Sequence, residues 1–489
     1  MTFSRRQFIE WAASMSAVTM ATRSGARLVT RLSAAEPAGF RPELLPSQKE
    51  IWDHETWMAK LGPKYTGNRA HVQFVDFLAT QMKSFGLDGA REHYALPMWE
   101  AKRWEITIAP AAGAPFKAPV TSYFPYSGQT PAAGVTGELV YAGSAPTFKL
   151  DALQGKVALV DFKTGVRNWA HEYKPWGVNP ASETFPEAVH PARGGVNDLT
   201  PFAKAGASAV IIGWADVSDA NAADQYTPFS RPPQGVPGVY VGHDTLARLK
   251  AIAGGGAKAT VVLEATVTPN TPTDTVIATL PGASADEVII VNTHTDGPNA
   301  TEENGAVGLV ALAKYFSKIP RGERKRTLVF PMTSGHFAGP WVSSIRGFIE
   351  KYPDVVKRAV AALTVEHLGC LEWMDDAQLQ YRATGKNEWS VAITPSKAAG
   401  EIMVAALQGS RDRCGVVNPV AGGFLGEGSA LSRAGIPTIG YIPQPNYLLA
   451  GPADGCIGKL SAELMHSQIE VFAKAIHKMD GMSAAQLKG

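Results

Sequence analysis

The second half of this chain alternates apolar strand-like runs with helical stretches, and this alternation constrains the fold more than any other feature. EVIIVN (287–292), TLVF (327–330) and AVAALTV (359–365) are short, continuous apolar runs. Such runs are typical of strands in a sheet that helices cover on both faces. Helical patterns follow the first two runs, through LVALAKYF (309–316) and near SSIRGFIEKY (343–352). The alternation predicts an α/β fold, a three-layer α/β/α sandwich around a mixed, mostly parallel sheet.

A different pattern separates residues 135–265 from the rest of the chain. From Val135 the sequence has short β-rich runs such as GELVYAG and KVALVDF, then a short helical stretch, LTPFAKAGA. A chain of 489 residues also exceeds the size at which one hydrophobic core keeps growing. We therefore predict a small β-rich α/β insert at 135–265, within an α/β domain made of residues 36–134 and 266–489.

The borders of that domain have their own signals. Between Gln48 and Gly86 the apolar residues recur at helical spacing in two stretches, which predicts two helices before the insert. After the insert, the strand-like run VVLEATVTP leads into NTPTDT (270–275). Its polar and turn-forming residues predict a linker there.

The first 35 residues have the character of a targeting segment. Ser4-Arg5-Arg6-Gln7-Phe8-Ile9 precedes a weakly apolar stretch rich in Ala, Met and Ser, and this order resembles a twin-arginine export signal. The stretch is too short and too polar to span a bilayer stably. We predict that residues 1–35 are a signal peptide and that the mature protein is periplasmic or secreted. A basic leader on a cytoplasmic protein is the alternative.

The charge balance argues against a polyanionic partner. The chain carries 46 basic and 44 acidic residues, for a formal net charge of +2. Phosphate backbones are bound by clustered Lys and Arg, which this balance does not supply. We expect a small-molecule or peptide substrate and no nucleic acid, and the sequence leaves the oligomeric state open.

Ionisable side chains gather where the predicted strands end. In an open α/β sheet, ligands bind in the crevice outside the carboxyl ends of the strands. Several strand ends that each deliver an imidazole or a carboxylate therefore predict a shared polar site. The residues concerned are His294, Asp296, Glu302, Glu303, His336, Glu366, His367 and Glu427.

The order of these segments resembles the zinc-dependent exopeptidase family that includes the bacterial leucyl aminopeptidases and the glutamate carboxypeptidases. The resemblance covers nearly the whole mature chain, from the paired helices after Gln48 to the terminal helix. Residues 135–265 resemble the protease-associated insert of that family. The resemblance implies hydrolysis of an amide or peptide bond at a zinc centre.

Three motifs match the family's metal ligands. His294-Thr295-Asp296 matches its His-x-Asp motif, in which the His is a zinc ligand and the Asp orients the site. Glu303-Asn304 stands where an Asp-Asn pair supplies the carboxylate that bridges two zinc ions. Glu366, in LTVEHLG, matches a later acidic ligand. The resemblance therefore implies His294, Glu303 and Glu366 as metal ligands.

Two of the family's positions differ in this sequence. Aligning SGHFAGPWVS with the family's Glu-Glu-x-Gly motif places His336 at the general base and Phe337 at a ligand. A shift by one residue places His336 at the ligand instead. The family's last ligand, a His, is absent from PQPNYLLAGPADG. Because a catalytic zinc normally has three protein ligands plus water, we expect a depleted centre with one zinc or other divalent cation, or none.

These comparisons lead to one hypothesis and two rivals. The leading hypothesis is an exported hydrolase that cleaves an amide or peptide-like small substrate. In it His336, Glu366 and Asp296 carry out or support catalysis, and the substrate-binding residues are His367, Glu427 and Tyr447. The rivals are a metal-independent enzyme that uses His and Glu acid-base chemistry, and a non-catalytic periplasmic binding protein.

Structural roles compete for the same groups. His294 and Asp296 can form a loop-stabilising pair. Glu302 and Glu303 can sit at a helix start, where the helix dipole favours carboxylates.

Overall fold

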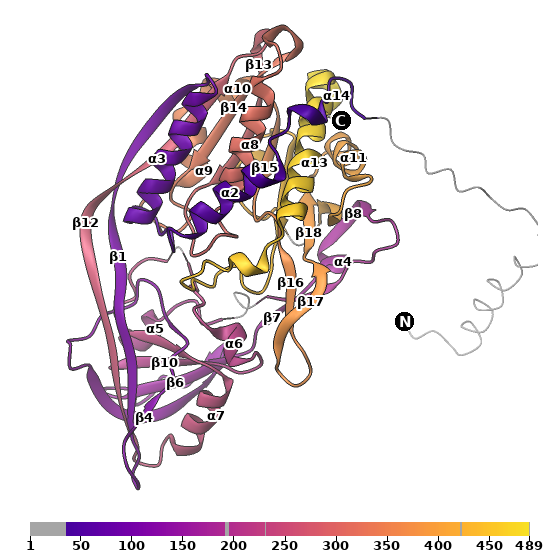
Figure 1. Ribbon diagram of the computed structural model, residues 1–489. Helices are drawn as coiled ribbons and strands as arrows, with labels where there is room; N and C mark the ends of the chain where they lie inside the picture. The colour runs from indigo at the N-terminus through magenta and orange to yellow at the C-terminus, as the bar shows by residue number, and fades with distance from the viewer. Residues whose placement is uncertain (1–35, 191–194, 230, 421–422, 489) are drawn as a thin grey trace, which may run out of the picture. The chain divides into compact units, whose positions relative to one another are not determined.

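One mixed sheet of sixteen strands organises residues 36–190, 195–229, 231–420 and 423–488, the part of the chain that this computed structural model describes (Figure 1). Along the sheet the strand order is β3-β11-β10-β6-β4-β12-β14-β13-β15-β20-β18-β19-β8, with β1, β2 and β5 paired outside this path. The strands are β1 (Asp88–Ala109), β2 (Phe116–Ala118), β3 (Ser122–Tyr123), β4 (Val135–Ser144), β5 (Thr147–Phe148), β6 (Val157–Phe162), β8 (Tyr173–Asn179), β10 (Ala209–Trp214), β11 (Gly238–Val241), β12 (Lys258–Leu280), β13 (Ser284–His294), β14 (Arg326–Thr333), β15 (Ala359–Val365), β18 (Trp389–Ile393), β19 (Arg413–Pro419) and β20 (Thr438–Pro443).

Two further strand pairs lie outside this sheet: β7 (Gly165–Asn168) with β9 (Glu187–His190), and β16 (Leu371–Asp375) with β17 (Tyr381–Asn387). The helices are α2 (Gln48–Ala59), α3 (Arg69–Ser84), α4 (Trp169–Glu172), α5 (Thr200–Lys204), α6 (Asp219–Ala222), α7 (His243–Ile252), α8 (Gly305–Ser317), α9 (Ser344–Lys351), α10 (Pro353–Arg358), α11 (Lys397–Leu407), α12 (Gly428–Arg433), α13 (Ala462–Gly481) and α14 (Ala484–Lys488). The 3-10 helices are η1 (Pro42–Leu44), η2 (Arg321–Glu323) and η3 (Ile457–Lys459).

The apolar run in β13 is buried on both faces of the sheet. Ile289 and Val291 belong to a core that includes side chains of α2, α3, α8, α11 and α13. Val288 and Ile290 belong to a second core, which contains residues of α9 and α12. Because successive strand residues point to opposite faces, helices must cover both sides of this sheet. The three-layer α/β/α architecture predicted from the sequence is confirmed.

The two predicted helices before the insert are present as α2 and α3. Each begins at a polar residue that caps its first turn: Ser47 Oγ accepts a hydrogen bond from Glu50 N, and Asn68 Oδ1 accepts one from His71 N. Such caps satisfy backbone donors that have no partner inside the helix. His71, which makes the second of these cap bonds, is buried, and its Nε2 lies 2.9 Å from the hydroxyl of Thr295, next to His294 in the chain.

The segment 270–275, predicted as a linker, is instead part of β12. This strand runs from Lys258 to Leu280 and pairs antiparallel with β1 along almost its whole length (Figure 1). Within the predicted linker, Thr273 is the partner of Tyr94 and Thr275 is the partner of Glu92. Residues 271–275 pair with β1, so the turn-forming Pro272 and Asp274 are accommodated within a strand.

Strands β4, β6, β10 and β11 form a run at one end of the sheet that has its own apolar cores. All the strand and helix segments that the sequence predicted between Val135 and Ile252 are present there. Two features cross the predicted borders: β12 continues through position 265, and β8 pairs with β19 of the main sheet. The bounds 135–265 remain a prediction.

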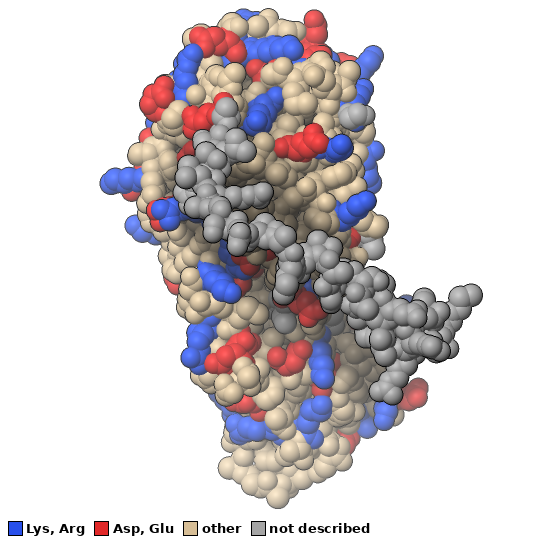
Figure 2. Space-filling view, turned by 90° about the vertical axis from the view of Figure 1, so that its right-hand side faces the viewer, with Lys and Arg blue, Asp and Glu red and all other residues tan. Residues whose placement is uncertain are grey.

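The surface shows no strong field of one sign on the face seen in Figure 2. Basic and acidic side chains are interspersed there, and neither gathers into a continuous patch. Among the described residues, no helix combines the length and the apolar composition needed to span a bilayer. The predicted signal peptide, residues 1–35, lies outside the described residues.

Candidate functional site

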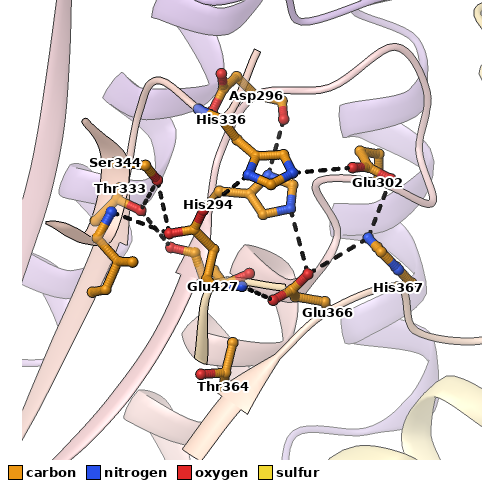
Figure 3. Close-up of polar contacts among 12 residues, drawn as sticks. His294, Asp296, Glu302, Thr333, His336, Ser344, Thr364, Glu366, His367 and Glu427 are labelled. Carbon is orange, nitrogen blue, oxygen red and sulfur yellow. Dashed lines mark hydrogen bonds and ion pairs between the residues drawn. The ribbon is translucent and has the colours of Figure 1, made fainter. Parts of the chain in front are cut away.

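The polar residues at the strand ends converge in one place, as Figure 3 shows. Parallel strands β14, β13 and β15 lie side by side, so their carboxyl ends open at the same edge. His294 is the last residue of β13, and Glu366 and His367 directly follow β15. His336 comes three residues after the end of β14, and Glu427 immediately precedes α12. All of these side chains are buried except that of His336, which is partly exposed.

His294 and His367 turn the same ring nitrogen toward the backbone. Nδ1 of His294 lies 3.0 Å from the carbonyl oxygen of Asp296, and Nδ1 of His367 lies 2.7 Å from that of Pro443. A carbonyl oxygen only accepts, so Nδ1 carries a hydrogen in both rings, and Nε2 keeps its lone pair in the neutral form of each ring. A carbonyl bonded to Nδ1 commonly fixes the tautomer of a metal-binding His in this way.

The two Nε2 atoms face Glu302. One ligand atom from each of His294, Glu302 and His367 can be chosen so that all three lie within 4.8 Å of one another. Nε2 of His367 is 3.1 Å from Oε2 of Glu302. Nε2 of His294, by contrast, is buried without a hydrogen-bond partner among the described residues. Leaving buried polar atoms unsatisfied is costly, and the three atoms fit the donor set of a cation such as zinc.

Glu366 adjoins this trio. Its Oε2 lies 4.0 Å from Nε2 of His294 and 3.9 Å from Nε2 of His367. Its other oxygen, Oε1, accepts a hydrogen bond of 2.8 Å from the backbone N–H of Glu427. Gly426 allows this approach: it has a φ of +67°, and a Cβ there would lie 2.4 Å from Glu366 Oε1. Glu366 is therefore placed to supply a fourth ligand oxygen.

His336 and Glu427 form a pair beside the trio. Nδ1 of His336 is 2.9 Å from Oε1 of Glu427. The second carboxylate oxygen of Glu427 accepts hydrogen bonds from Ser344 Oγ (2.8 Å) and from the backbone N–H of Ile345 (3.1 Å). The ring of His336 stacks on that of His294 with centroids 4.2 Å apart. A carboxylate on Nδ1 and an Nε2 toward the site is the arrangement of a general acid-base His.

Asp296 holds the turn that carries His336. Its carboxylate accepts hydrogen bonds from the backbone N–H groups of Gly335, His336 and Phe337, the last at 2.8 Å. It also accepts one from the hydroxyl of Thr66. A carboxylate that accepts this many bonds is a strong anchor. Asp296 therefore positions His336 and does not face the trio itself.

His336 and Glu427 each stabilise the charged form of the other. Burial acts to lower the pKa of His336, but the hydrogen bond to Glu427 and the carboxylates of Glu427, Glu302 and Glu366 outweigh it and raise the pKa to about 10. Burial acts to raise the pKa of Glu427, but the hydrogen bond and the charge of His336 lower it to about 2. The pair is therefore ionic when no cation is bound nearby.

The trio shows the same balance of burial and charge. Burial, followed by the neighbouring His336, lowers the pKa of His294. For Glu302 burial acts upward, but the charge and the hydrogen-bonding group of His367 lower the pKa. For His367 burial acts downward, but Glu302 raises the pKa. A neutral His294 beside an ionised Glu302 matches the protonation states that a cation requires of its ligands.

Glu303, predicted as a metal ligand, is directed elsewhere. Its Oε1 lies 2.5 Å from Nζ of Lys64, and both side chains are fully buried. Lys64 is held there by a β-bridge to Gly297. Burial raises the pKa of Glu303 to about 7, although Lys64 opposes the rise. The neighbouring residue, Glu302, takes the place in the cluster that the sequence assigned to Glu303.

Some of the other predicted site residues lie in the cluster and one does not. His294 and Glu366 lie in the cluster, with 4.0 Å between Nε2 and Oε2. Glu302, predicted in this polar site or at a helix start, and His367, predicted as a substrate contact, lie there as well. Tyr447 does not join the cluster: its hydroxyl donates toward the carbonyl oxygens of Leu371 and Lys459, each at 2.9 Å. The sequence signal that points to Glu302 is its position next to Glu303. Two consecutive side chains rarely face the same way, so one of the two glutamates is expected to face the site and the other to face away from it.

An aromatic wall borders the site. Phe337, which the alignment placed at a ligand position, has a buried ring that stacks on Phe229 with centroids 4.8 Å apart. Phe229 also lies 5.2 Å from the ring of His336, and Tyr226 lies 5.9 Å from Phe337. Residues 226 and 229 come from the predicted insert, so this segment lies directly against the acid-base pair.

The sequence matches no protein-family model and no curated protein. Solved structures do resemble it. A peptidase M28 precursor from Shewanella amazonensis has a TM-score of 0.63 at 16% identity, over 89% of this chain and 97% of that one. A zinc aminopeptidase from Bacillus subtilis has a TM-score of 0.61 at 17% identity, over 90% and 98%. An aminopeptidase from Aneurinibacillus sp. strain AM-1 has a TM-score of 0.58 at 18% identity, over 90% and 96%. The chain therefore has the fold seen in the M28 peptidase and in these aminopeptidases.

Proposed function

We propose that this protein is a hydrolase of the aminopeptidase type that cleaves an amide or peptide-like small substrate with one divalent cation, zinc or a similar ion. His294, Glu302 and His367 would hold the cation, and Glu366 would complete the set. The observation that carries the proposal is that one buried ligand atom from each of His294, Glu302 and His367 lies within 4.8 Å of the other two, while His294 Nε2 has no hydrogen-bond partner among the described residues. Two imidazoles and carboxylate oxygens are a ligand set that zinc commonly takes in hydrolases.

A cation bound there supplies Lewis-acid chemistry, lowering the pKa of water and polarising a carbonyl group. His336 would accept the proton of the attacking water at Nε2 and return it to the leaving amine. Glu427 keeps the ring oriented by holding the hydrogen on Nδ1. When Glu302 and Glu366 serve as ligands, their charge no longer raises the pKa of His336 as strongly, so this ring can exchange a proton nearer neutral pH.

The surroundings support an apolar group on the substrate. Phe229 and Phe337 form one wall beside His336. An apolar wall with a few convergent polar groups is the usual character of a small-molecule site. The fold likeness to peptidases supports a peptide-like substrate. We therefore expect aminoacyl-arylamides and dipeptides with apolar side chains to be the first substrates to test.

A metal assay tests the proposal directly. Protein purified without chelator is expected to contain about one equivalent of zinc or another divalent ion, and to lose activity on arylamides when the ion is removed. Restoring the ion is expected to restore the activity. Protein that binds no divalent ion, even when zinc is supplied in excess, would falsify the metallohydrolase proposal.

One observation favours a second candidate, a metal-independent acid-base enzyme. His336 with Glu427 and His367 with Glu302 are already matched pairs of opposite charge at 2.9 Å and 3.1 Å. Such pairs can move protons without a cation. Turnover of any amide or ester that persists at full rate in a chelator, and that fails in His336→Gln, would favour this candidate over the first.

Export is proposed separately, because residues 1–35 lie outside the described part of the chain. The twin arginines Arg5 and Arg6 support a twin-arginine route to the periplasm or the exterior. In a bacterial host with this route, replacing both with Lys is expected to retain the protein in the cytoplasm. Unchanged export of that variant would remove the proposal.

A further inference from the structure

Asn299 makes an unusually complete set of hydrogen bonds three residues before Glu302. Its side chain is fully buried in the turn between β13 and α8. Oδ1 accepts from the backbone N–H groups of Thr301 (2.8 Å) and Glu302 (3.0 Å). These bonds fix the backbone from which the Glu302 carboxylate projects into the trio.

The amide nitrogen of Asn299 is committed to a different segment. Nδ2 donates toward the carbonyl oxygens of Tyr447 (3.0 Å), Leu448 (2.8 Å) and Ala450 (2.7 Å). A primary amide has two hydrogens, so three carbonyl oxygens share them. The side chain therefore joins the Glu302 turn to the loop 447–450, which follows β20.

The loop 447–450 in turn carries a segment of the predicted insert. The backbone N–H of Tyr226 donates to the carbonyl oxygen of Leu449 (2.7 Å), and Gln225 forms a β-bridge with Ala450. Gln225 Nε2 also donates to the carbonyl oxygen of Asn446 at 3.0 Å. Four residues after Gln225, Phe229 lies against the ring of His336. A continuous set of contacts thus runs from Glu302 through Asn299 to the wall beside His336.

We propose that Asn299 is a positioning residue that couples cation binding at Glu302 to the segment 225–229. This inference rests on the proposed function for its cation but names a residue and a route that the proposed function does not use. Coupling between two sites is reciprocal. A cation that orders Glu302 therefore orders 225–229, and a loosened 225–229 weakens cation binding.

Asn299→Asp is the informative variant. The remaining oxygen can still accept from Thr301 and Glu302, whereas the new oxygen faces three carbonyl oxygens and makes no bond to them. Added negative charge near Glu302 would by itself attract a cation. A loss of zinc affinity in this variant must therefore come from lost positioning. Asn446→Asp is the matched control, because Asn446 lies beside the same loop but its side-chain amide donates, within the described part of the chain, to Trp373 O and not to the loop 447–450.

Zinc titration of the full chain and amide hydrogen exchange read out the coupling. Asn299→Asp is expected to bind zinc at least tenfold more weakly than the wild type, and Asn446→Asp within about twofold of it. In the wild type, zinc is expected to slow amide exchange in 225–229 and 446–450 and to leave exchange in α7 unchanged. In Asn299→Asp, zinc is expected to leave exchange in 225–229 and 446–450 unchanged as well. A folded Asn299→Asp with wild-type zinc affinity would overturn the proposal, whatever its melting temperature.

Two other outcomes are also decisive. If Asn299→Asp does not fold, the wild-type exchange data decide: zinc binding that leaves 225–229 and 446–450 unchanged refutes the coupling. If the wild type binds no zinc, the proposed function fails. The contact route through Asn299 is then tested by comparing hydrogen exchange of the wild type and the variant without zinc. Faster exchange confined to 225–229 and 446–450 in Asn299→Asp, or in Asn299→Ser if the first variant is unstable, then supports the route. Exchange that is faster throughout the chain, or that does not differ from the wild type, overturns the proposed route.

Discussion

Lys64 Nζ lies 2.5 Å from Glu303 Oε1, with both side chains buried out of reach of water. This ion pair decides which of two consecutive glutamates faces the polar cluster. Glu303 neutralises the lysine, and Glu302 is left to meet His294 and His367. The pair is a structural element next to the candidate cation site and separate from it.

Substituting the two glutamates one at a time is expected to separate stability from cation binding. Glu303→Gln leaves Lys64 buried without a counter-charge, so the free energy of unfolding is expected to fall by about 3 kcal/mol, while zinc still binds. Glu302→Gln removes a ligand, so the zinc affinity is expected to fall by more than about tenfold. Chemical denaturation and zinc titration measure the two effects. Loss of zinc in Glu303→Gln with retention in Glu302→Gln would reverse our assignment.

Loss of the Asp296 carboxylate is expected to displace His336. Asp296→Asn turns one acceptor oxygen into a donor that faces the backbone N–H groups of residues 335–337. We expect about 2–3 kcal/mol lower stability and at least a tenfold lower kcat on any substrate found. Thr66→Val is the control, since it removes one hydroxyl bond and leaves the amides in place. Equal effects of the two substitutions would contradict the anchoring role.

The pH profile is expected to report the His336–Glu427 pair. Glu427 raises the pKa of His336, so Glu427→Gln lowers it and leaves the ring in its basic form down to a lower pH. The acidic limb of kcat/KM is therefore expected to move to lower pH by about one unit. Ser344→Ala keeps the charge of Glu427 and is expected to leave that limb in place. An unchanged limb in Glu427→Gln would show that His336 is not the titrating base.

His71 is expected to make the fold acid-sensitive. Burial lowers the pKa of this His from its usual 6.5 to about 4, so the unfolded chain binds the extra proton between these two values. The contribution of His71 to the free energy of unfolding is therefore expected to be fully present above pH 6.5. It is expected to decrease as the pH falls toward 4, by about 3 kcal/mol in total. Urea titrations at several pH values measure the slope.

A variant isolates this contribution. His71→Gln retains polar atoms for Thr295 and Thr273, which contact the ring nitrogens at 2.9 Å and 3.2 Å. It is expected to be less stable at pH 7 but to lose less stability than the wild type between pH 6.5 and 4. Parallel curves for the two proteins would assign the acid sensitivity to other groups.

The layered fold was accessible from the sequence because its signals are local. In β13, Val288 to Val291 alternate between two helix-covered cores, and a continuous apolar run is the pattern that such a strand requires. The caps Ser47 and Asn68 likewise act within one helical turn. By contrast, the segment 270–275 was taken for a linker because its partner, β1, lies about 180 residues earlier in the chain.

The candidate site shows the same division between features that local sequence signals indicate and features that contacts with distant segments decide. The sequence predicted that His294, Glu366 and His336 gather at one place, because strand ends in an open α/β sheet meet at one edge. It could not decide between Glu302 and Glu303, because Lys64, which pairs with Glu303, lies far away in sequence. The hydroxyl of Tyr447, predicted as a substrate contact, bonds to Leu371 O and Lys459 O, two contacts that no local pattern reveals.

The sequence by itself determined the layers, the strands that deliver polar side chains, and the residue types that converge, because periodicity and strand-end placement depend on neighbours along the chain. Only the tertiary structure decided which atoms meet: that Glu302 joins His294 and His367, that Glu427 pairs with His336, and that Asn299 ties the Glu302 turn to the loop 447–450. Such contacts depend on side-chain direction and on partners from distant segments, and a linear pattern contains neither.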